Sequence, residues 1–160
     1  MTRYVIDAPT LVHLVDHELR IDPSVQLVAP SSIRSEGLQL LLHDVTDGRR
    51  TDTAALETHV RITELKIRLL GDRVSRGTAW RIARERGWDT LRDAEYLAIT
   101  RLQADALVTV DPDLTAKAEG VVPVAPLRAL IGGDERTRSE LSCPPELDPA
   151  RSARPWLLSG

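Results

Sequence analysis

The sequence predicts an α/β fold, namely a three-layer α/β/α domain with a central, mostly parallel sheet and a helical arm. Four short runs rich in valine and leucine have their apolar residues in continuous stretches instead of alternating with polar ones, which is typical of buried parallel strands. Helical patterns separate these runs, as crossover connections between parallel strands require. The strand candidates are Arg3–Ile6, Leu27–Ala29, Ala106–Val110 and Val121–Val124.

The helix candidates follow from apolar spacing and from the residues that begin or end each pattern. The first helix begins near Pro9, because proline at a first helical position lacks only an N–H that has no partner there. Gly71 interrupts a long helical pair, and we expect this pair, about residues 52–86, to protrude as the arm. The other expected helices run over about 31–43 and 90–103, with a short one after Pro126.

The 160-residue length suits one domain with a real core, which we assign to residues 1–131. Residues 132–160 have few periodic apolar positions and many charges, and we expect a tail outside the core, flexible or docked on a partner. One cysteine, Cys143, excludes an internal disulfide. No signal peptide or membrane-spanning run is recognisable, so we expect a cytoplasmic protein that does not enter a membrane.

The charge distribution is uneven although the net charge is only −3. Residues 61–92 contain nine basic and four acidic side chains, whereas the segments on either side are each net acidic. A basic segment in an acidic protein could bind a polyanion such as RNA. A solvated helix face with many arginines explains it equally well, and the charge alone does not decide between the two.

Two aspartates follow apolar runs directly. Asp7 ends the first run and Asp111 follows the third, and in open α/β sheets ligands bind at the carboxyl ends of strands. The alternative for each residue is a helix N-cap, since a proline lies one or two residues further on in each case.

Two further acids share the apolar side of a predicted helix. Glu36 lies between Ile33 and Leu40 at helical spacing, and Asp93 is four residues before Leu97. A buried carboxylate needs a partner or a cation. Glu36 could instead pair with an arginine, and Asp93 could belong to a capping box that begins at Thr90.

Four gathered carboxylates would repel one another by about 4 kcal/mol per pair at 4 Å and an effective dielectric of 20. Such a site must bind protons or a metal. Oxygen ligands without a cysteine or histidine cluster favour Mg²⁺ or Mn²⁺, which promote in-line phosphoryl displacement. We therefore expect catalytic and metal-binding roles for four residues: Asp7, Glu36, Asp93 and Asp111. Asp89 and Asp113 are spare candidates.

The segments "YVIDAPTLVHL" and "RDAEYLAITRLQADALVTVDPDL", with the Glu36 helix between them, resemble the PIN-domain family. The similarity is strongest to the VapC-type ribonuclease toxins of bacterial toxin–antitoxin pairs, and it covers about residues 3–131. It implies an endoribonuclease that uses Mg²⁺ or Mn²⁺ to cut RNA. In that family, four acids matching the four named above hold the metal. The resemblance further implies a homodimer and an inhibitory antitoxin protein.

Two alternative functions remain, and one metal motif is discounted. The chain could be a catalytically silent PIN-like module that binds a protein or RNA partner. It could be a metal-assisted phosphatase or phosphoacceptor, although the two-acid signature and a lysine near the acids are missing; Lys66 and Lys117 are the only lysines. Finally, His13 and His17 approximate a zinc motif. However, leucines and valines define the buried face of that helix, so we expect an exposed polar face.

Overall fold

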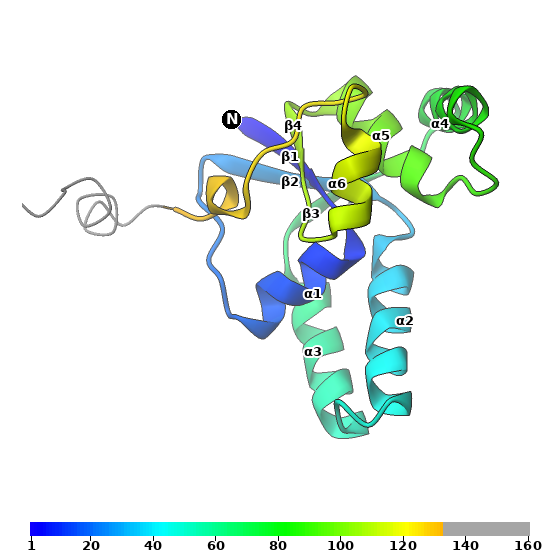
Figure 1. Cartoon of the computed structure of the whole chain (residues 1–160). Coiled ribbons are helices and arrows are strands. Elements are labelled where there is room, and N and C mark those ends of the chain that lie inside the picture. Colours follow the sequence, from blue (N-terminus) through cyan, green and yellow to red (C-terminus); the bar gives the residue numbers. More distant parts are fainter. Residues whose placement is uncertain (133–160) are drawn as a thin grey trace, which may run out of the picture.

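The computed structural model describes residues 1–132, in which strands and helices alternate along the chain (Figure 1). The expected tail lies outside the described residues, apart from Gly132, and so does Cys143. No helix within residues 1–132 has both the length and the apolar character that crossing a membrane demands. The elements are β1 (Thr2–Ile6), α1 (Ala8–Asp16), β2 (Val25–Pro30), α2 (Ile33–Thr46), α3 (Asp52–Glu64), β3 (Ile67–Leu70), α4 (Arg73–Arg86), α5 (Arg92–Gln103), β4 (Ala106–Val108), α6 (Pro112–Ala118) and the 3₁₀ helix η1 (Leu127–Leu130).

The four strands form one parallel sheet in the order β3-β2-β1-β4. Helix α5 lies against β1, β2 and β4, and α4 packs on α5, whereas α1, α2 and α3 pack on one another. The predicted three-layer α/β/α class is confirmed. Because all strands run the same way, their carboxyl ends meet at one edge of the sheet, and α1 and α2 begin there.

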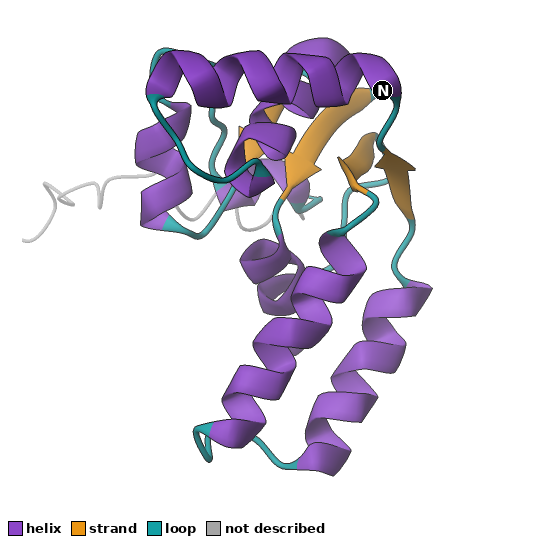
Figure 2. Cartoon of the chain, turned by 90° about the vertical axis from the view of Figure 1, so that its right-hand side faces the viewer, coloured by secondary structure: helices purple, strands orange, loops and turns teal. Residues whose placement is uncertain are grey.

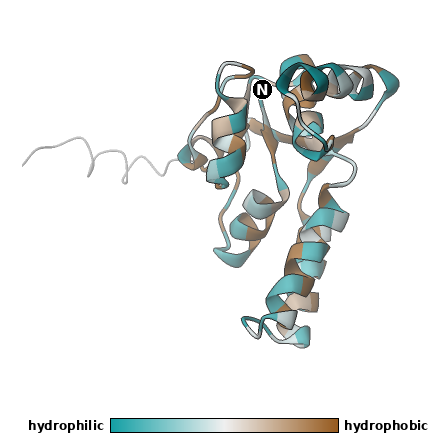
Figure 3. Cartoon of the chain, turned by 45° about the vertical axis from the view of Figure 1, so that its right-hand side comes forward, coloured by the Kyte–Doolittle hydropathy of each residue, from teal (hydrophilic) through white to brown (hydrophobic). Residues whose placement is uncertain are grey.

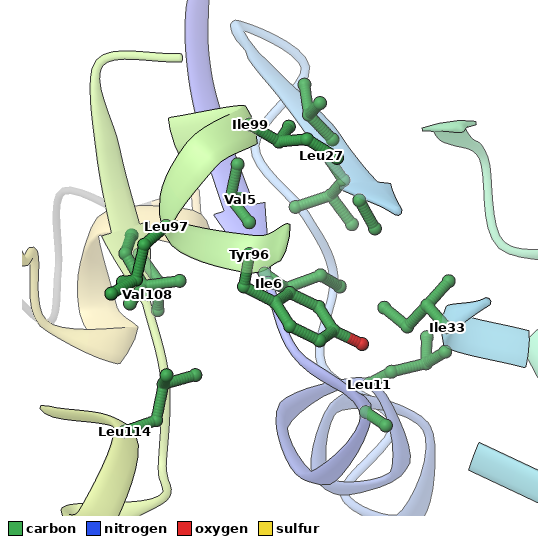
Figure 4. Close-up of a cluster of buried hydrophobic side chains, with 14 of the residues drawn as sticks. Val5, Ile6, Leu11, Leu27, Ile33, Tyr96, Leu97, Ile99, Val108 and Leu114 are labelled. Carbon is green, nitrogen blue, oxygen red and sulfur yellow. The ribbon is translucent and has the colours of Figure 1, made fainter. Parts of the chain in front are cut away.

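The core is aliphatic, as expected from a chain without phenylalanine. Val5 and Ile6 of β1 are completely buried, and so is Leu97 of α5, which packs over the sheet. Figure 4 shows these side chains around Tyr96, whose ring lies among aliphatic groups and whose hydroxyl points to the side on which Ile33 lies. The core thus holds α5, and with it Tyr96, rigidly against the strand ends.

The expected helix over residues 52–70 is wrong in its last six residues. Helix α3 ends at Glu64, and Ile67–Leu70 form the edge strand β3, paired with β2 from Leu27 to Pro30. Leucine, lysine and arginine favour a helix locally, but pairing with β2 partly buries the apolar residues of this run and overrides that preference.

The arm is also a different pair of helices from the one expected. It consists of α2 and α3, which descend side by side away from the sheet (Figure 2), and not of residues 52–86. The buried side chains Leu41 and Ile62 close the interface between the two helices. Arg50, in the turn that joins them, contacts Asp16 at 2.7 Å and Asp44 at 3.3 Å. Helix α4 lies instead beside α5.

The last two predicted strands are shorter than expected. β4 ends at Val108, and the segment 121–124 makes only one parallel bridge, between Val124 and Leu107. Thr109 and Val110 leave the sheet because their backbone leads directly into the N-terminus of α6. The short helix expected after Pro126 is present as η1.

Candidate active site

Asp7 and Asp111 follow the neighbouring parallel strands β1 and β4, so both reach the same sheet edge. Each is also a helix N-cap: Asp7 accepts a hydrogen bond from the Thr10 N–H at 3.2 Å, and Asp111 accepts one from the Asp113 N–H at 2.9 Å. Each aspartate can therefore be a helix N-cap and a residue of the candidate site at the same time. Capping fixes the rotamer of each carboxylate and still leaves oxygen lone pairs available.

Two threonine hydroxyls tie these loops together. The Thr10 hydroxyl donates to Oδ1 of Asp7, and the Thr109 hydroxyl donates to Oδ2 at 2.7 Å. The same hydroxyls accept the backbone N–H groups of Val110 and Asp111, both at 3.0 Å. Sequence reasoning did not assign Thr109 a role, although it lies inside the motif quoted for the resemblance. Its position two residues before Asp111 was the sequence feature that could have indicated this role.

Burial is the main influence on Asp7, whose side chain is almost inaccessible to solvent. It raises the pKa of the carboxyl above its ordinary value, and the negative charge of Asp111 raises it further. The hydrogen bonds from Thr10 and Thr109 favour the charged form and oppose this rise only in part. A nearby cation would relieve both unfavourable effects.

Glu36 is anchored by hydroxyls and not by an arginine. It lies on the first turn of α2, where its Oε1 accepts from the Ser32 hydroxyl at 2.8 Å. Its Oε2 accepts from the buried Tyr96 hydroxyl of α5 at 2.9 Å. Burial, followed by the charge of Glu36, raises the pKa of Tyr96 far above its usual range, so this hydroxyl remains a donor at neutral pH.

Asp93 is held by a lysine. The capping box predicted from Thr90 is absent: Leu91 is the N-cap residue of α5 and makes no side-chain capping bond. Instead, the Lys117 ammonium of α6 donates to Oδ2 of Asp93 and lies 5.3 Å from the centre of the Trp88 ring. The expectation that no lysine is near the acids was therefore wrong. Sequence could not show this contact, because it joins two helices that meet only in the folded chain.

All four predicted acids line a single cavity of about 130 Å³ at the carboxyl edge of the sheet. They come from four different parts of the chain, and the fold places all four in the wall of this cavity. The wall also contains three polar residues to which the sequence analysis assigned no role: Gln39, His43 and Tyr96. The cavity is lined by Asp7, Ala8, Pro9, Glu36, Gln39, Leu40, His43, Arg92, Asp93, Tyr96, Asp111 and Leu114.

The donor set of this cavity suits a hard divalent cation, because four carboxylates offer only oxygen ligands. In the residues that the structure describes, however, no three histidine, cysteine, aspartate or glutamate side chains are grouped closely enough to hold one metal ion. Asp93 directs one oxygen to Lys117. The ammonium thus neutralises one of the four acids where a metal ion would otherwise do so.

The remaining candidates lie elsewhere. Asp89 and Asp113 are exposed and are not part of the cavity wall. In α1, Asp16 binds Arg50 and His17 hydrogen-bonds to the His13 carbonyl at 2.9 Å. Leu11, Leu14 and Val15 form the buried face of α1. The expected polar outer face of this helix is confirmed.

No protein-family model matches the chain, and no curated protein matches it either. A solved structure of PAE2754 from Pyrobaculum aerophilum superposes with a TM-score of 0.60 and 23% sequence identity. The match covers 80% of this chain and 92% of that one. At this identity the similarity shows a common fold over most of both chains.

Proposed function

We propose that this protein is a metal-dependent endoribonuclease that hydrolyses RNA phosphodiesters. The observation that carries the proposal is the convergence of Asp7, Glu36, Asp93 and Asp111 on one cavity at the carboxyl edge of a parallel sheet. These carboxylates would hold Mg²⁺ or Mn²⁺. When bound, such an ion polarises the phosphoryl group, activates water and stabilises the leaving oxygen.

In this proposal, several residues around the four acids have defined roles. Thr10 and Thr109 orient the Asp7 carboxylate, while Ser32 and Tyr96 orient that of Glu36. Oriented acids lose little entropy when a ligand binds. Arg92 lines the same cavity and would bind the substrate phosphate as a fixed positive charge.

The test is RNA cleavage by the purified chain with Mg²⁺, with Mn²⁺ and with EDTA. Asp93→Asn should abolish metal-dependent cleavage, while its circular dichroism spectrum and melting temperature stay close to those of the wild type. Asp89→Asn, which removes an exposed acid nearby in the sequence, should cleave normally. Cleavage that survives Asp93→Asn would refute the assignment.

A catalytically silent PIN-like module is the second candidate. The contact of Lys117 with Asp93 favours it, because one of the acids is already neutralised without a metal. Calorimetric titration with Mn²⁺ distinguishes the two candidates. A silent module would bind RNA or protein without binding Mn²⁺, whereas the nuclease would bind the ion and lose it on addition of EDTA.

The toxin role, an antitoxin partner and a homodimer belong to the same proposal. Four large apolar side chains on the arm are 41–60% exposed, and a protein partner would cover such positions. Light scattering should give about twice the 17.7 kDa of the chain for a dimer. Expression of the active chain, compared with Asp93→Asn, should arrest growth if it is a toxin. The four side chains are Leu38, Leu42, Leu56 and Val60.

A further inference from the structure

Helix α4 combines a dense positive charge with an exposed aromatic ring. It contains five arginines against one glutamate, and the arginine side chains are all exposed. Within residues 1–132, none of the five has a carboxylate oxygen within 4 Å, whereas Arg49, Arg50, Arg61 and Arg92 do. Figure 3 shows α4 as the most continuously hydrophilic helix facing the viewer. The α4 arginines are Arg73, Arg76, Arg81, Arg84 and Arg86.

The pattern of α4 separates two faces. Ser75, Thr78, Ala79, Ile82 and Ala83 are buried, and they define the face that packs toward α5. Arg73, Gly77, Trp80 and Arg84 follow one another at intervals of four, three and four residues, so they form one stripe on the opposite face. We call these four residues the α4 stripe.

Trp80 is the aromatic residue of α4, and 60% of it is exposed. Gly77 lies one turn before Trp80 on the same face, and a Cβ there would meet no atom within 4 Å. The stripe therefore has open space one turn before the exposed indole, with Arg84 one turn after it and Arg73 two turns before it.

This combination matches a single-stranded nucleic acid. Arginines neutralise successive phosphates, and an accessible indole stacks on a base of any identity. A second copy of the chain fits poorly, because a symmetric contact through this face would bring like-charged arginines together.

The α4 surface is linked to the candidate active site. Arg76 lines a cavity of about 150 Å³ that also contains Ser31 and Ser32, at the carboxyl end of β2. Ser32 is the residue that donates to Glu36. A strand that crosses α4 would therefore lead toward the carboxylates.

We propose that the α4 stripe is a binding platform for single-stranded RNA, on which Trp80 stacks a base and Arg73 and Arg84 contact flanking phosphates. The proposal rests on the proposed ribonuclease function for its choice of RNA. Beyond that function, the proposal specifies which surface of the protein binds the RNA and that the RNA is single-stranded.

The test measures binding of a fluorescein-labelled 12-nucleotide uridine RNA by anisotropy, in EDTA so that the RNA stays intact. Trp80→Ala should weaken binding about 5- to 150-fold, whereas Trp80→Phe should recover part of the affinity. Val124→Ala, a control at an exposed apolar side chain outside α4, the arm and the candidate site, should bind as the wild type does. The RNA should quench tryptophan fluorescence in the wild type and much less in Trp80→Phe.

The arginine part is tested by salt dependence. Arg73→Gln and Arg84→Gln should each lower the slope of log affinity against log salt by about 0.7, while Arg128→Gln on η1 should leave it unchanged. A duplex of the same uridine RNA with oligoadenosine should be insensitive to Trp80→Ala, because its bases are already stacked.

The proposal is overturned if Trp80→Ala binds the uridine RNA as tightly as the wild type does. It is also overturned if single and double strands lose affinity equally, or if only an acidic peptide such as polyglutamate binds the stripe. These failures differ from failure of the proposed function. If Trp80→Ala cleaves RNA in Mg²⁺ and binds it as tightly as the wild type does, only the proposed RNA platform is rejected. If the wild type binds RNA through the α4 stripe but does not cleave it, only the proposed nuclease function is rejected.

Discussion

Lys117 of α6 and Asp93 of α5 form an ion pair at the rim of the cavity that all four predicted acids line. The Asp93 side chain is 17% exposed and that of Lys117 39%, so solvent screens this pair only in part. The ammonium also lies 5.3 Å from the centre of the Trp88 ring. A divalent ion that binds Asp93 must therefore compete with a positive charge that the fold has already placed at Oδ2.

Replacing Lys117 should strengthen metal binding if the proposed metal site is correct. In Lys117→Met the ion no longer competes with an ammonium for Asp93, and the local potential becomes more negative. We expect about fivefold tighter Mn²⁺ binding by calorimetry, which corresponds to loss of a competing pair of about 1 kcal/mol.

Lys66→Met is the matched control, because Lys66 is the only other lysine and is exposed. Its Mn²⁺ affinity should equal that of the wild type. Unchanged or weaker binding in Lys117→Met would show that the ammonium does not compete with the metal. If the wild type does not bind Mn²⁺ at all, the metal-dependent function itself fails.

The hydroxyl of Tyr96 should contribute measurable stability through Glu36. Tyr96 is 2% exposed, and Tyr96→Phe keeps the ring but removes the 2.9 Å hydrogen bond to the carboxylate. Hydrogen bonds to charged groups contribute about 1.5–3 kcal/mol, and Ser32 still donates to Glu36. We expect the free energy of unfolding to fall by about 1–2 kcal/mol in urea titrations.

A double-mutant cycle isolates this contact. Tyr96→Phe should cost much less in a Glu36→Ala background, giving a coupling of about 1 kcal/mol. Tyr4→Phe, at the only other tyrosine, serves as the control. Equal costs of Tyr96→Phe in both backgrounds would mean that the hydroxyl stabilises the fold without acting through Glu36.

The sequence was sufficient for three of the four parallel strands, β1, β2 and β4, because each is a short apolar run between helical patterns. β1 is an unbroken apolar run followed by Asp7, and the topology of any parallel sheet then brings Asp7 and Asp111 to one edge. β3 was missed because its residues favour a helix locally. Only hydrogen bonding to β2 makes Ile67–Leu70 a strand.

The partners of the acids could not be predicted. Thr109 reaches Asp7 across 102 residues of sequence, Tyr96 reaches Glu36 across 60, and Lys117 reaches Asp93 across 24. These contacts depend on how two elements are rotated against each other. No spacing rule along a single helix or strand encodes that rotation.

A glycine inside α2 offers a way to stabilise the fold. Gly37 is buried, yet a Cβ there would lie 3.8 Å from Ile62 Cδ1 and 3.9 Å from Leu11 Cδ2, which are ordinary contact distances. Alanine is favoured over glycine inside a helix by about 1 kcal/mol. Gly37→Ala should therefore raise the free energy of unfolding by about 1 kcal/mol.

Urea titration and thermal melting measure this effect. Gly77→Ala in α4, where a Cβ would meet nothing within 4 Å, isolates the helix preference without added packing. It should stabilise the protein by no more than Gly37→Ala does. A loss of stability in Gly37→Ala alone would show that α1, α2 and α3 pack too closely for the methyl group.

The ion pair between Asp16 and Arg50 should make stability depend on acidic pH. The hydrogen bond from Arg50 is the main cause that lowers the pKa of Asp16 below its ordinary value of 3.8, although partial burial opposes it. A carboxyl with a lowered pKa in the folded state stabilises the protein above its unfolded pKa, and this contribution disappears as the pH falls through the folded value.

Asp16→Asn should thus reduce the free energy of unfolding by roughly 1 kcal/mol at pH 7. This figure is modest because Asp16 is 30% exposed and solvent partly screens its pair with Arg50. In urea titrations the difference from the wild type should begin to shrink near pH 4 and vanish well below it, while Asp89→Asn controls for the loss of one negative charge. A difference that stays constant down to pH 2.5 would mean that Asp16 stabilises the junction of α1 with the arm by packing and not by its charge.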